Sequence, residues 1–320
     1  MIGITMGDAN GVGPEIILKA FKENHIRGKT IVIGDYRILD YCNNRLNINV
    51  SLRDIADPND FIPGCVNVLN LNILDESDLT IGKISKKVGH AALQYIHKTV
   101  KLVLKKELDA MVTLPINKEA IGLSKPGFQG HTDFIAELCN VQDYTMMLAS
   151  DRLIVTHASM HVSLGDALQK VNKERVFKVI QLTNEVLKKL RSDSRIAVAG
   201  LNPHAGEGGV FGEEDIQEIL PAVQLAKQKG INASGPVPPD TVFYQAVNGK
   251  FDAVVCMYHD QGHIPMKLID FEGAVNVTLG LPITRTSVDH GTAYDIAYTG
   301  VASITSFCNA YKMAGAIISQ

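Results

Sequence analysis

The sequence predicts an α/β protein with a largely parallel sheet, arranged in two domains. Short apolar runs alternate with stretches of helical periodicity, which is the pattern of strand and helix units around a parallel sheet. A chain of 320 residues with 46% hydrophobic content can bury two ordinary cores. Polar residues repeatedly follow the apolar runs, and the carboxyl ends of parallel strands form the edge at which such sheets bind ligands.

The composition excludes several classes of partner. The formal net charge is −3, and the lysines and arginines are scattered, so no basic patch is available for nucleic acid or an anionic membrane. The cysteines form no C-x-x-C pair, so neither a disulfide framework nor a thiolate zinc site is indicated. The N-terminus lacks the basic region of a signal peptide, and no apolar run approaches about 18 residues. We therefore expect a cytoplasmic protein that acts on a small molecule.

The first apolar run, residues 2–5, predicts a strand that opens into a glycine-rich turn at residues 7–15. A helix follows, with Pro14 in its first turn and apolar residues at helical spacing through Phe21. Such a turn can direct backbone amides towards an anion. The spacing of its glycines, however, matches neither G-x-G-x-x-G nor a Walker A sequence. A purely structural loop is at least as well supported.

Three more strands and a long helix are predicted before residue 115. Residues 30–33, 66–71 and 110–114 are the strand candidates, and residues 88–108 predict one amphipathic helix. The third strand ends just before Lys118, whose ammonium could hold a charged substrate group. A solvated loop lysine is the simpler interpretation, and the sequence alone favours it.

A Pro/Gly-rich stretch at residues 124–133 could connect the two domains. Within it, His131 and Thr132 follow a glycine and precede a helical pattern. A helix N-terminus with two hydrogen-bonding side chains would therefore be available to an anion. Thr132 could instead be a simple N-cap.

Histidines follow three strand candidates in the second half of the chain. They are His157 or His161 after residues 153–156, His204 after residues 195–201, and His259 after residues 251–256. A lone histidine is more often a satisfied polar residue than a metal ligand. Three at equivalent positions favour a divalent metal site, for which imidazole is a common ligand. Spacing does not decide between His157 and His161.

The C-terminal third contains a further anion-binding candidate. Residues 205–212 are too glycine-rich for regular structure and suggest a close-fitting or mobile loop, followed by a helix at 213–229 and a stiff connector at 235–240. A strand within residues 276–287 presents Arg285, whose guanidinium suits a phosphate or carboxylate; a surface arginine is the alternative. Residues 289–300 predict a polar turn before the last helix.

Six motifs together resemble one known family. They are Gly7–Glu15, Pro115-Ile116-Asn117-Lys118, Gly130-His131-Thr132, Leu201–Glu207, Tyr258-His259-Asp260-Gln261-Gly262 and Gly280–Ala293. In combination they resemble the 4-hydroxythreonine-4-phosphate dehydrogenase family, the metal-dependent enzymes called PdxA. The resemblance covers almost the whole chain.

This resemblance implies a two-domain α/β fold like that of isocitrate and isopropylmalate dehydrogenases, with a mostly parallel sheet and an active-site cleft between the domains. It implies a nucleotide-side domain of residues 1–128 plus 277–320, and a metal-binding and dimerisation domain of residues 129–276. It also implies a homodimer whose active site is shared between subunits.

The resemblance further implies roles for individual residues. The metal ligands would be His161, His204 and His259, which favours His161 over His157. The substrate would contact His131, Thr132, Lys267, Asn276 and Arg285. Because residues 289–300 resemble the adenine-side loop of related NAD enzymes, the cofactor would contact Asp289, His290, Gly291, Thr292 and Asp295. Lys267 or Asp260 would assist proton transfer.

The implied reaction is the NAD-dependent oxidation and decarboxylation of a 4-phosphorylated 3-hydroxy acid, as in pyridoxal phosphate biosynthesis. It would use one divalent metal ion per site, Zn, Mg, Mn or Co, and NADP is an alternative to NAD. His263, followed by Ile264-Pro265, instead resembles a branch that converts D-threonate or D-erythronate 4-phosphate to dihydroxyacetone phosphate in sugar-acid catabolism. A metal-dependent phosphometabolite hydrolase and a non-catalytic binding protein are the more distant alternatives.

Overall fold

The computed structural model describes residues 1–319, which divide into two compact units. One unit contains Met1–Gln142 and Leu281–Ser319, and the other contains Asp143–Gly280. The boundaries differ from those expected after residues 128 and 276. Helix α5 (His131–Leu138) packs against α3 (Lys86–Leu104) and therefore belongs to the first unit. Strand β11 (Val275–Leu279) pairs with β6 (Thr145–Ala149), which keeps it in the second.

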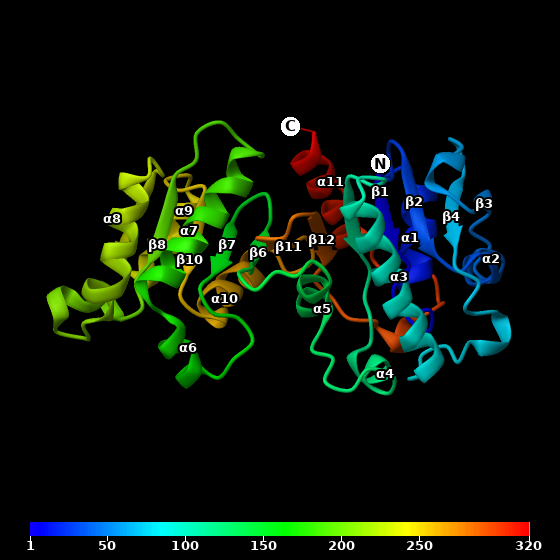
Figure 1. Ribbon diagram of the computed structural model, residues 1–320, viewed down its shortest axis with the longest axis horizontal. Helices are drawn as coiled ribbons and strands as arrows, with labels where there is room; N and C mark the ends of the chain where they lie inside the picture. The colour runs from blue at the N-terminus through cyan, green and yellow to red at the C-terminus, as the bar shows by residue number, and fades with distance from the viewer. Residues whose placement is uncertain (320) are drawn as a thin grey trace. The chain divides into compact units, whose positions relative to one another are not determined.

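The first unit is built on a parallel sheet with the strand order β3-β4-β2-β1-β5-β12. In Figure 1 it joins the blue and cyan segments to the orange and red segment that ends in α11. Its strands are β1 (Ile2–Thr5), β2 (Thr30–Gly34), β3 (Leu52–Ile55), β4 (Val66–Asn70), β5 (Ala110–Thr113) and β12 (Thr284–Val288). The strands expected at residues 2–5, 30–33, 66–71 and 110–114 are thus confirmed.

Helices α3 and α11 pack directly on this sheet, α3 on β1, β2 and β5 and α11 on β5 and β12. Helix α3 ends at Leu104 rather than at the expected residue 108, because Lys106 adopts a left-handed conformation with φ 60°. The remaining helical segments of the unit are α1 (Gly13–Lys22), α2 (Tyr36–Arg45), α4 (Lys118–Gly122), α11 (Thr305–Ile318), η1 (Pro58–Asp60), η2 (Glu76–Asp78) and η5 (Tyr294–Ile296).

The second unit has a mixed sheet with the strand order β11-β6-β7-β10-β8-β9. Strand β6 runs antiparallel to both of its neighbours, and the other pairs are parallel. The strands not yet bounded are β7 (Ile154–His157), β8 (Ile196–Ala199), β9 (Ala233–Val237) and β10 (Ala253–Cys256). The expected connector at 235–240 is wrong in its first part, since Gly235, Pro236 and Val237 lie in β9.

Five α-helices belong to this unit: α6 (Leu164–Lys170), α7 (Lys173–Lys188), α8 (Leu220–Gln228), α9 (Pro239–Val247) and α10 (His259–Ile269). The helix expected at 213–229 begins as a π-helical turn, η4 (Asp215–Ile219), and continues as α8. The segment η3 (Pro203–Gly209) follows β8. None of the helices among residues 1–319 is both long and apolar enough to cross a membrane.

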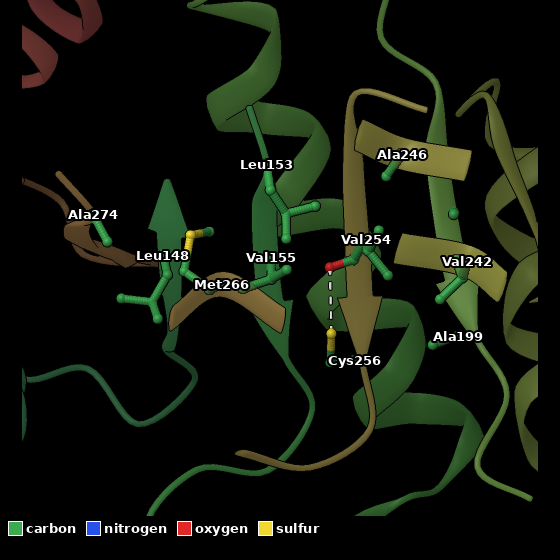
Figure 2. Packing of buried hydrophobic residues seen from close by; sticks show 11 residues of the cluster. Leu148, Leu153, Val155, Ala199, Val242, Ala246, Val254, Cys256, Met266 and Ala274 are labelled. Atoms are coloured by element: carbon green, nitrogen blue, oxygen red, sulfur yellow. Dashed lines mark hydrogen bonds between the residues drawn. The ribbon is translucent and has the colours of Figure 1, made fainter. Parts of the chain in front are cut away.

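Helix α10, which follows the carboxyl end of β10, packs against the core of the second unit. Figure 2 shows Met266 of α10 beside Leu148 and Val155 of the sheet. Strands β7, β8 and β10 are buried along their whole length, as continuous apolar runs predict for parallel strands covered on both faces. Because Met266 is fully buried in this cluster, it anchors α10 to the core of the second unit.

Candidate active site

Arg285 on β12 is the most buried charged group of the first unit's candidate site, with 2% of its surface exposed. Its Nη2 donates a hydrogen bond to Oγ1 of Thr113 at 2.8 Å, and its Nη1 donates to Oγ1 of Thr132 at 3.3 Å. Burial lowers the pKa of Arg285 to about 9, so the guanidinium remains charged at neutral pH. The alternative of a surface arginine is therefore wrong.

His131 and Thr132 form the first turn of α5. Gly130 is the N-cap residue of α5, so the alternative of Thr132 as N-cap is wrong. The hydroxyl of Thr132 instead accepts the hydrogen bond from Arg285. Burial, together with the positive charges of Arg285 and Lys118, holds the pKa of His131 well below its usual value. The imidazole is thus neutral, and within residues 1–319 its buried Nε2 has no hydrogen-bond partner.

Lys118 adds a second positive charge to this group. Its Nζ lies 3.7 Å from the place that a Cβ on Gly130 would occupy, although the side chain is exposed. The group formed by Lys118, His131, Thr132 and Arg285 therefore combines two cations with a helix N-terminus. Such a combination suits a phosphate or a carboxylate.

A cluster of four histidines lies at the carboxyl ends of β7 and β10 in the second unit. These strands are parallel, with Cys256 opposite His157, so both end at the same edge. The cluster contains His157, His161, His259 and His263. The rings of His259 and His263 are stacked with centroids 3.5 Å apart, and the rings of His161 and His259 lie 5.4 Å apart.

The rings of two of the three expected metal ligands are spaced like imidazoles that share one ion. Imidazoles that bind one metal tetrahedrally through nitrogens about 2.1 Å away have centroids roughly 5 Å apart, close to the observed His161–His259 separation of 5.4 Å. Nδ1 of His259 lies 2.7 Å from Oδ1 of Asp260. Because the carboxylate only accepts, Nδ1 carries the proton and Nε2 keeps its lone pair for a metal.

The third expected ligand, His204, does not group with His161 and His259. No three His, Cys, Asp or Glu side chains are grouped closely enough to hold a metal anywhere in residues 1–319. His204 is exposed beyond β8, and its ring lies 6.2 Å from that of Phe211. Its strand is nonetheless the parallel neighbour of β10, so both strands end at the same edge of the sheet.

The segment around His204 has a left-handed backbone. The φ angles are 54° at His204, 55° at Ala205 and 43° at Glu207, a region that L residues adopt at a cost of about 1–2 kcal/mol each. The buried carboxylate of Asp215 holds the segment by accepting the backbone N–H groups of Leu201 at 2.9 Å and Asn202 at 3.1 Å. Strain of this kind collects at functional sites.

Gln261 ties the ends of β8 and β10 together. Its Nε2 donates to the carbonyl of Gly200 at 2.8 Å, and its Oε1 accepts from the N–H of Met257 at 2.7 Å. Gln261 and Asp215 were not singled out in the sequence as supporting residues. Gln261 stands in the Tyr258–Gly262 motif, which assigned it no role, and its burial, like that of Asp215, is a tertiary property.

The expected catalytic residues differ in their surroundings. The hydrogen bond from His259 holds the pKa of Asp260 below its usual value, so this exposed carboxylate is a poor proton donor at neutral pH. Lys267 is half-buried on α10, with Nζ 5.1 Å from the ring centroid of Phe271. Asn276 on β11 donates to Sδ of Met146 at 2.9 Å, and no partner for its buried Oδ1 is found in residues 1–319.

The expected cofactor residues lie in the loop between β12 and α11. The N–H of Asp289 donates to Oγ of Ser306 at 3.2 Å, and the carbonyl of Thr292 accepts from the N–H of Val12 at 3.1 Å. Asp295 lies in η5 and is exposed, as are His290 and Gly291. This loop is therefore anchored at Asp289 and Thr292, while His290 and Gly291 between them face solvent.

Comparison with known families decides the relationship. Residues 27–314 match the model of the pyridoxal phosphate biosynthetic protein PdxA. The chain belongs to the PdxA family. This confirms the family resemblance of the six motifs.

Two relatives of the PdxA family have equal identity to the chain and different names. A D-threonate 4-phosphate dehydrogenase of Pectobacterium atrosepticum is 44% identical over 98% of this chain and 98% of its own. A 4-hydroxythreonine-4-phosphate dehydrogenase of Desulforapulum autotrophicum is 44% identical over 98% of this chain and 94% of its own. Both names describe dehydrogenases of 4-phosphorylated compounds.

Solved structures confirm the expected fold class. A 4-hydroxythreonine-4-phosphate dehydrogenase from Klebsiella pneumoniae matches with a TM-score of 0.90 and 42% identity, covering 99% of both chains. A beta-decarboxylating dehydrogenase from Thermococcus kodakarensis has a TM-score of 0.50 at 12% identity, covering 95% of this chain and 80% of its own. The second likeness concerns the fold alone.

Proposed function

We propose that this member of the PdxA family is an NAD-dependent, divalent-metal-dependent dehydrogenase that oxidises and decarboxylates a 4-phosphorylated 3-hydroxy acid such as 4-hydroxythreonine 4-phosphate. The observation that carries the proposal is the pair of imidazoles of His161 and His259, 5.4 Å apart at the carboxyl end of a parallel sheet. The names of the full-length relatives support the reaction class.

The anionic substrate is bound by the positive group of the first unit. Arg285 presents a charged guanidinium that is already oriented by Thr113 and Thr132, so little side-chain freedom is lost on binding. Neutral His131 can donate from Nε2 in one tautomer and accept in the other, which suits a phosphate oxygen in either protonation state. Asn276 and Lys267 complete the proposed set of substrate contacts.

The metal ligands in this proposal are His161, His204 and His259. A bound divalent metal supplies a Lewis acid that lowers the pKa of the substrate alcohol and polarises the carbonyl formed from it. Asp260 orients His259 by accepting its Nδ1 proton. Proton transfer at the alcohol is assigned to Lys267 or Asp260; the ionised carboxylate of Asp260 can accept the proton that the alcohol loses.

The cofactor in this proposal is NAD, with NADP as the alternative; it would supply the acceptor for the hydride from the carbon that bears the alcohol. Asp289, His290, Gly291, Thr292 and Asp295 are the proposed contacts. A carboxylate such as Asp289 favours NAD where it can accept from a ribose hydroxyl, and it would repel the extra phosphate of NADP.

A homodimer with a shared active site is the proposed assembly, and the cytoplasm is the proposed location. Exposed apolar side chains in the second unit support the dimer: Leu164 is 62% exposed, Val210 is 72% exposed and Phe211 is 49% exposed. The five cysteines are free thiols, which suits a reducing compartment. Light scattering coupled to gel filtration would measure the mass of the assembly directly.

D-threonate or D-erythronate 4-phosphate is the second candidate substrate, and His263 is the observation that favours it. Its ring stacks on that of His259 and its Nδ1 lies 3.2 Å from Nε2 of His157. A hydrogen-bonding ring next to a proposed metal ligand offers a partner to a hydroxyl at C2, where the biosynthetic substrate carries an amino group.

The deciding experiment measures NADH formation with added divalent metal on three substrates at matched concentration: 4-hydroxythreonine 4-phosphate, D-threonate 4-phosphate and D-erythronate 4-phosphate. Activity confined to the amino compound supports the biosynthetic role, and preference for a sugar-acid phosphate supports the catabolic one. If none of the three substrates gives NADH and inorganic phosphate is released, the protein is a hydrolase rather than a dehydrogenase. If neither NADH nor inorganic phosphate is formed, the remaining interpretation is a non-catalytic binding protein.

The ligand assignment is tested with His204→Ala and a matched control, His97→Ala, which removes an exposed histidine of α3. Loss of bound metal in the first variant only, with circular dichroism unchanged, is expected. Full metal content and full turnover in the His204→Ala protein would remove His204 from the site.

A further inference from the structure

The glycine-rich turn at Gly7–Glu15 uses its backbone amides within the protein. The N–H of Asp8 donates to the carbonyl of Pro115 at 2.8 Å, and the N–H of Asn10 donates to Oδ1 of Asp8 at 2.8 Å. The N–H of Val12 donates to the carbonyl of Thr292 at 3.1 Å. These amides already have acceptors, so an anion-binding role for the turn is not supported. The last of them leads to the loop that follows β12.

The carboxylate of Glu15 binds the far end of that same loop. The side chain is fully buried in α1, and its two oxygens accept the N–H of Gly300 at 3.1 Å and the N–H of Ala302 at 2.8 Å. Lys19, one turn further along α1, donates from Nζ to the carbonyls of Gly300 at 2.9 Å and Ala302 at 2.6 Å. One face of α1 therefore satisfies donors and acceptors of the same two loop residues.

Two tyrosines of the loop reach back to the turn. The hydroxyl of Tyr294 donates to Oδ2 of Asp8 at 2.8 Å, and the buried hydroxyl of Tyr298 donates to the carbonyl of Ala9 at 2.8 Å. A Cβ at Gly11 would lie 2.8 Å from the carbonyl oxygen of Thr292, so the close approach of the two segments requires glycine at that position. The contacts thus extend along the loop from Thr292 to Ala302.

We propose that Glu15 is a positioning residue that holds the loop of residues 289–302 in its cofactor-binding conformation, with Lys19 and Asp8 in supporting roles. The inference rests on the proposed function, since it takes this loop to bind the nicotinamide cofactor. A buried carboxylate that accepts two backbone N–H groups orders the loop before the cofactor arrives, so binding loses less conformational entropy. Its removal should weaken cofactor binding and leave the chemical step unchanged.

The test compares Glu15→Gln with Glu23→Gln, an exposed carboxylate at the C-cap of the same helix. The introduced side-chain amide has only one acceptor oxygen, so one loop N–H loses its partner. Because hydrogen bonds to charged groups contribute about 1.5–3 kcal/mol, the KM for NAD should rise by roughly tenfold or more. The KM for the phosphorylated substrate and kcat at saturating NAD should stay within about twofold of wild type, and Glu23→Gln should behave as wild type.

A second variant and a second measurement keep the inference testable if Glu15→Gln folds poorly. Lys19→Met removes the ammonium donors from a half-buried side chain, and it should raise the KM for NAD in the same direction but less. Hydrogen exchange of residues 289–302 in the cofactor-free protein should accelerate in both variants, with α11 unchanged.

The outcomes separate this inference from the proposed function. An unchanged KM for NAD in both variants, in a wild-type enzyme that forms NADH, would overturn the positioning role and leave the dehydrogenase standing. A proportional loss of kcat on all substrates without a change in KM for NAD would also overturn it. A wild-type protein that forms no NADH would remove the proposed function, and the inference with it.

Discussion

Nε2 of His157 lies 3.2 Å from Nδ1 of His263, and this contact joins the last residue of β7 to α10. Nδ1 of His157 is 3.2 Å from the carbonyl oxygen of Met146, which can only accept, so the proton of the neutral ring is on Nδ1. Nε2 is therefore an acceptor, and the Nδ1–H of His263 is shared between it and the carbonyl oxygen of His259, which lies 3.0 Å away. The close packing requires Gly262, where a Cβ would lie 2.5 Å from Nε2 of His157.

Replacing His157 should weaken metal binding. Burial lowers the pKa of His157 to about 3, so the ring acts as a neutral acceptor, and His157→Phe removes that acceptor while keeping most of the ring volume. His157 contacts His263, whose ring stacks on that of the proposed ligand His259, so a loss smaller than the roughly 10–100-fold of a ligand's direct partner is expected in a competition titration with a chelator. His97→Phe, on the surface of α3, is the control. Equal affinities in both variants would make His157 a packing residue only.

Arg285→Lys should raise the KM for the phosphorylated substrate. A lysine cannot reproduce the planar donors that contact Thr113 and Thr132, and it cannot bind an oxyanion in a bidentate manner. Loss of a charge-assisted hydrogen bond of about 1.5–3 kcal/mol corresponds to roughly 10–100-fold, with the KM for NAD unchanged. Steady-state kinetics on both substrates measure this. Arg152→Lys, at an exposed turn, should match wild type, and a wild-type KM in Arg285→Lys would exclude Arg285 from the substrate site.

Asp8 should make the stability of the protein depend on pH. Burial raises its pKa from 3.8 to about 6, against the opposing hydrogen bonds from Tyr294 and Asn10. At a pH between these two pKa values, the folded state binds more protons at Asp8 than the unfolded state does. Raising the pH through this range therefore favours unfolding. The contribution of Asp8 to the free energy of unfolding should therefore fall by roughly 3 kcal/mol between about pH 4 and pH 7.

The Asp8→Asn variant removes this titration and retains a carbonyl acceptor for the N–H of Asn10. Its free energy of unfolding relative to wild type should accordingly increase from about pH 4 to pH 7 and then level off. Urea unfolding at several pH values measures the difference. A difference that stays constant across this range would show that Asp8 titrates as an ordinary carboxyl group.

Met266→Ala should destabilise the second unit and disturb the histidine cluster together. Met266 is fully buried in α10, and truncation of such a side chain typically costs about 2–5 kcal/mol. Leu268→Ala is the matched control on the same helix, because Leu268 is 82% exposed and should change stability by less than about 0.5 kcal/mol. Urea unfolding with metal titration compares the two. Equal stabilities would place Met266 outside the core.

The sequence predicted much of the parallel sheet because its strands are continuous apolar runs, and this pattern survives without tertiary information. Residues 2–5 and 251–256 illustrate it, since both contain strands that are buried throughout. Segments whose identity depends on packing were missed. Strand β9 contains Gly235 and Pro236, residues that usually mark turns, and only pairing with β8 makes it a strand.

The sequence also predicted that the candidate site residues lie at strand ends, because a strand, a turn and a polar residue follow one another directly in the chain. The choice between His157 and His161 was not local, because both follow the same strand by a few residues. The tertiary structure buries His157 against Met146 and His263 and leaves His161 exposed beside His259. Burial of a side chain depends on the residues that pack against it, and the spacing of residues in the sequence does not show which residues those are.

The protein's family and fold class were thus determined by its sequence alone, through apolar periodicity and six motifs of fixed composition. The burial of Arg285, the neutral state of His131 and the hydrogen bonds from Gly300 and Ala302 to Glu15 were decided only by the tertiary structure. The physical reason is that solvation and hydrogen-bond partners of a charged group come from residues distant in the chain. Glu15 and Ala302 meet because two separate segments pack together, and no local pattern encodes that distance.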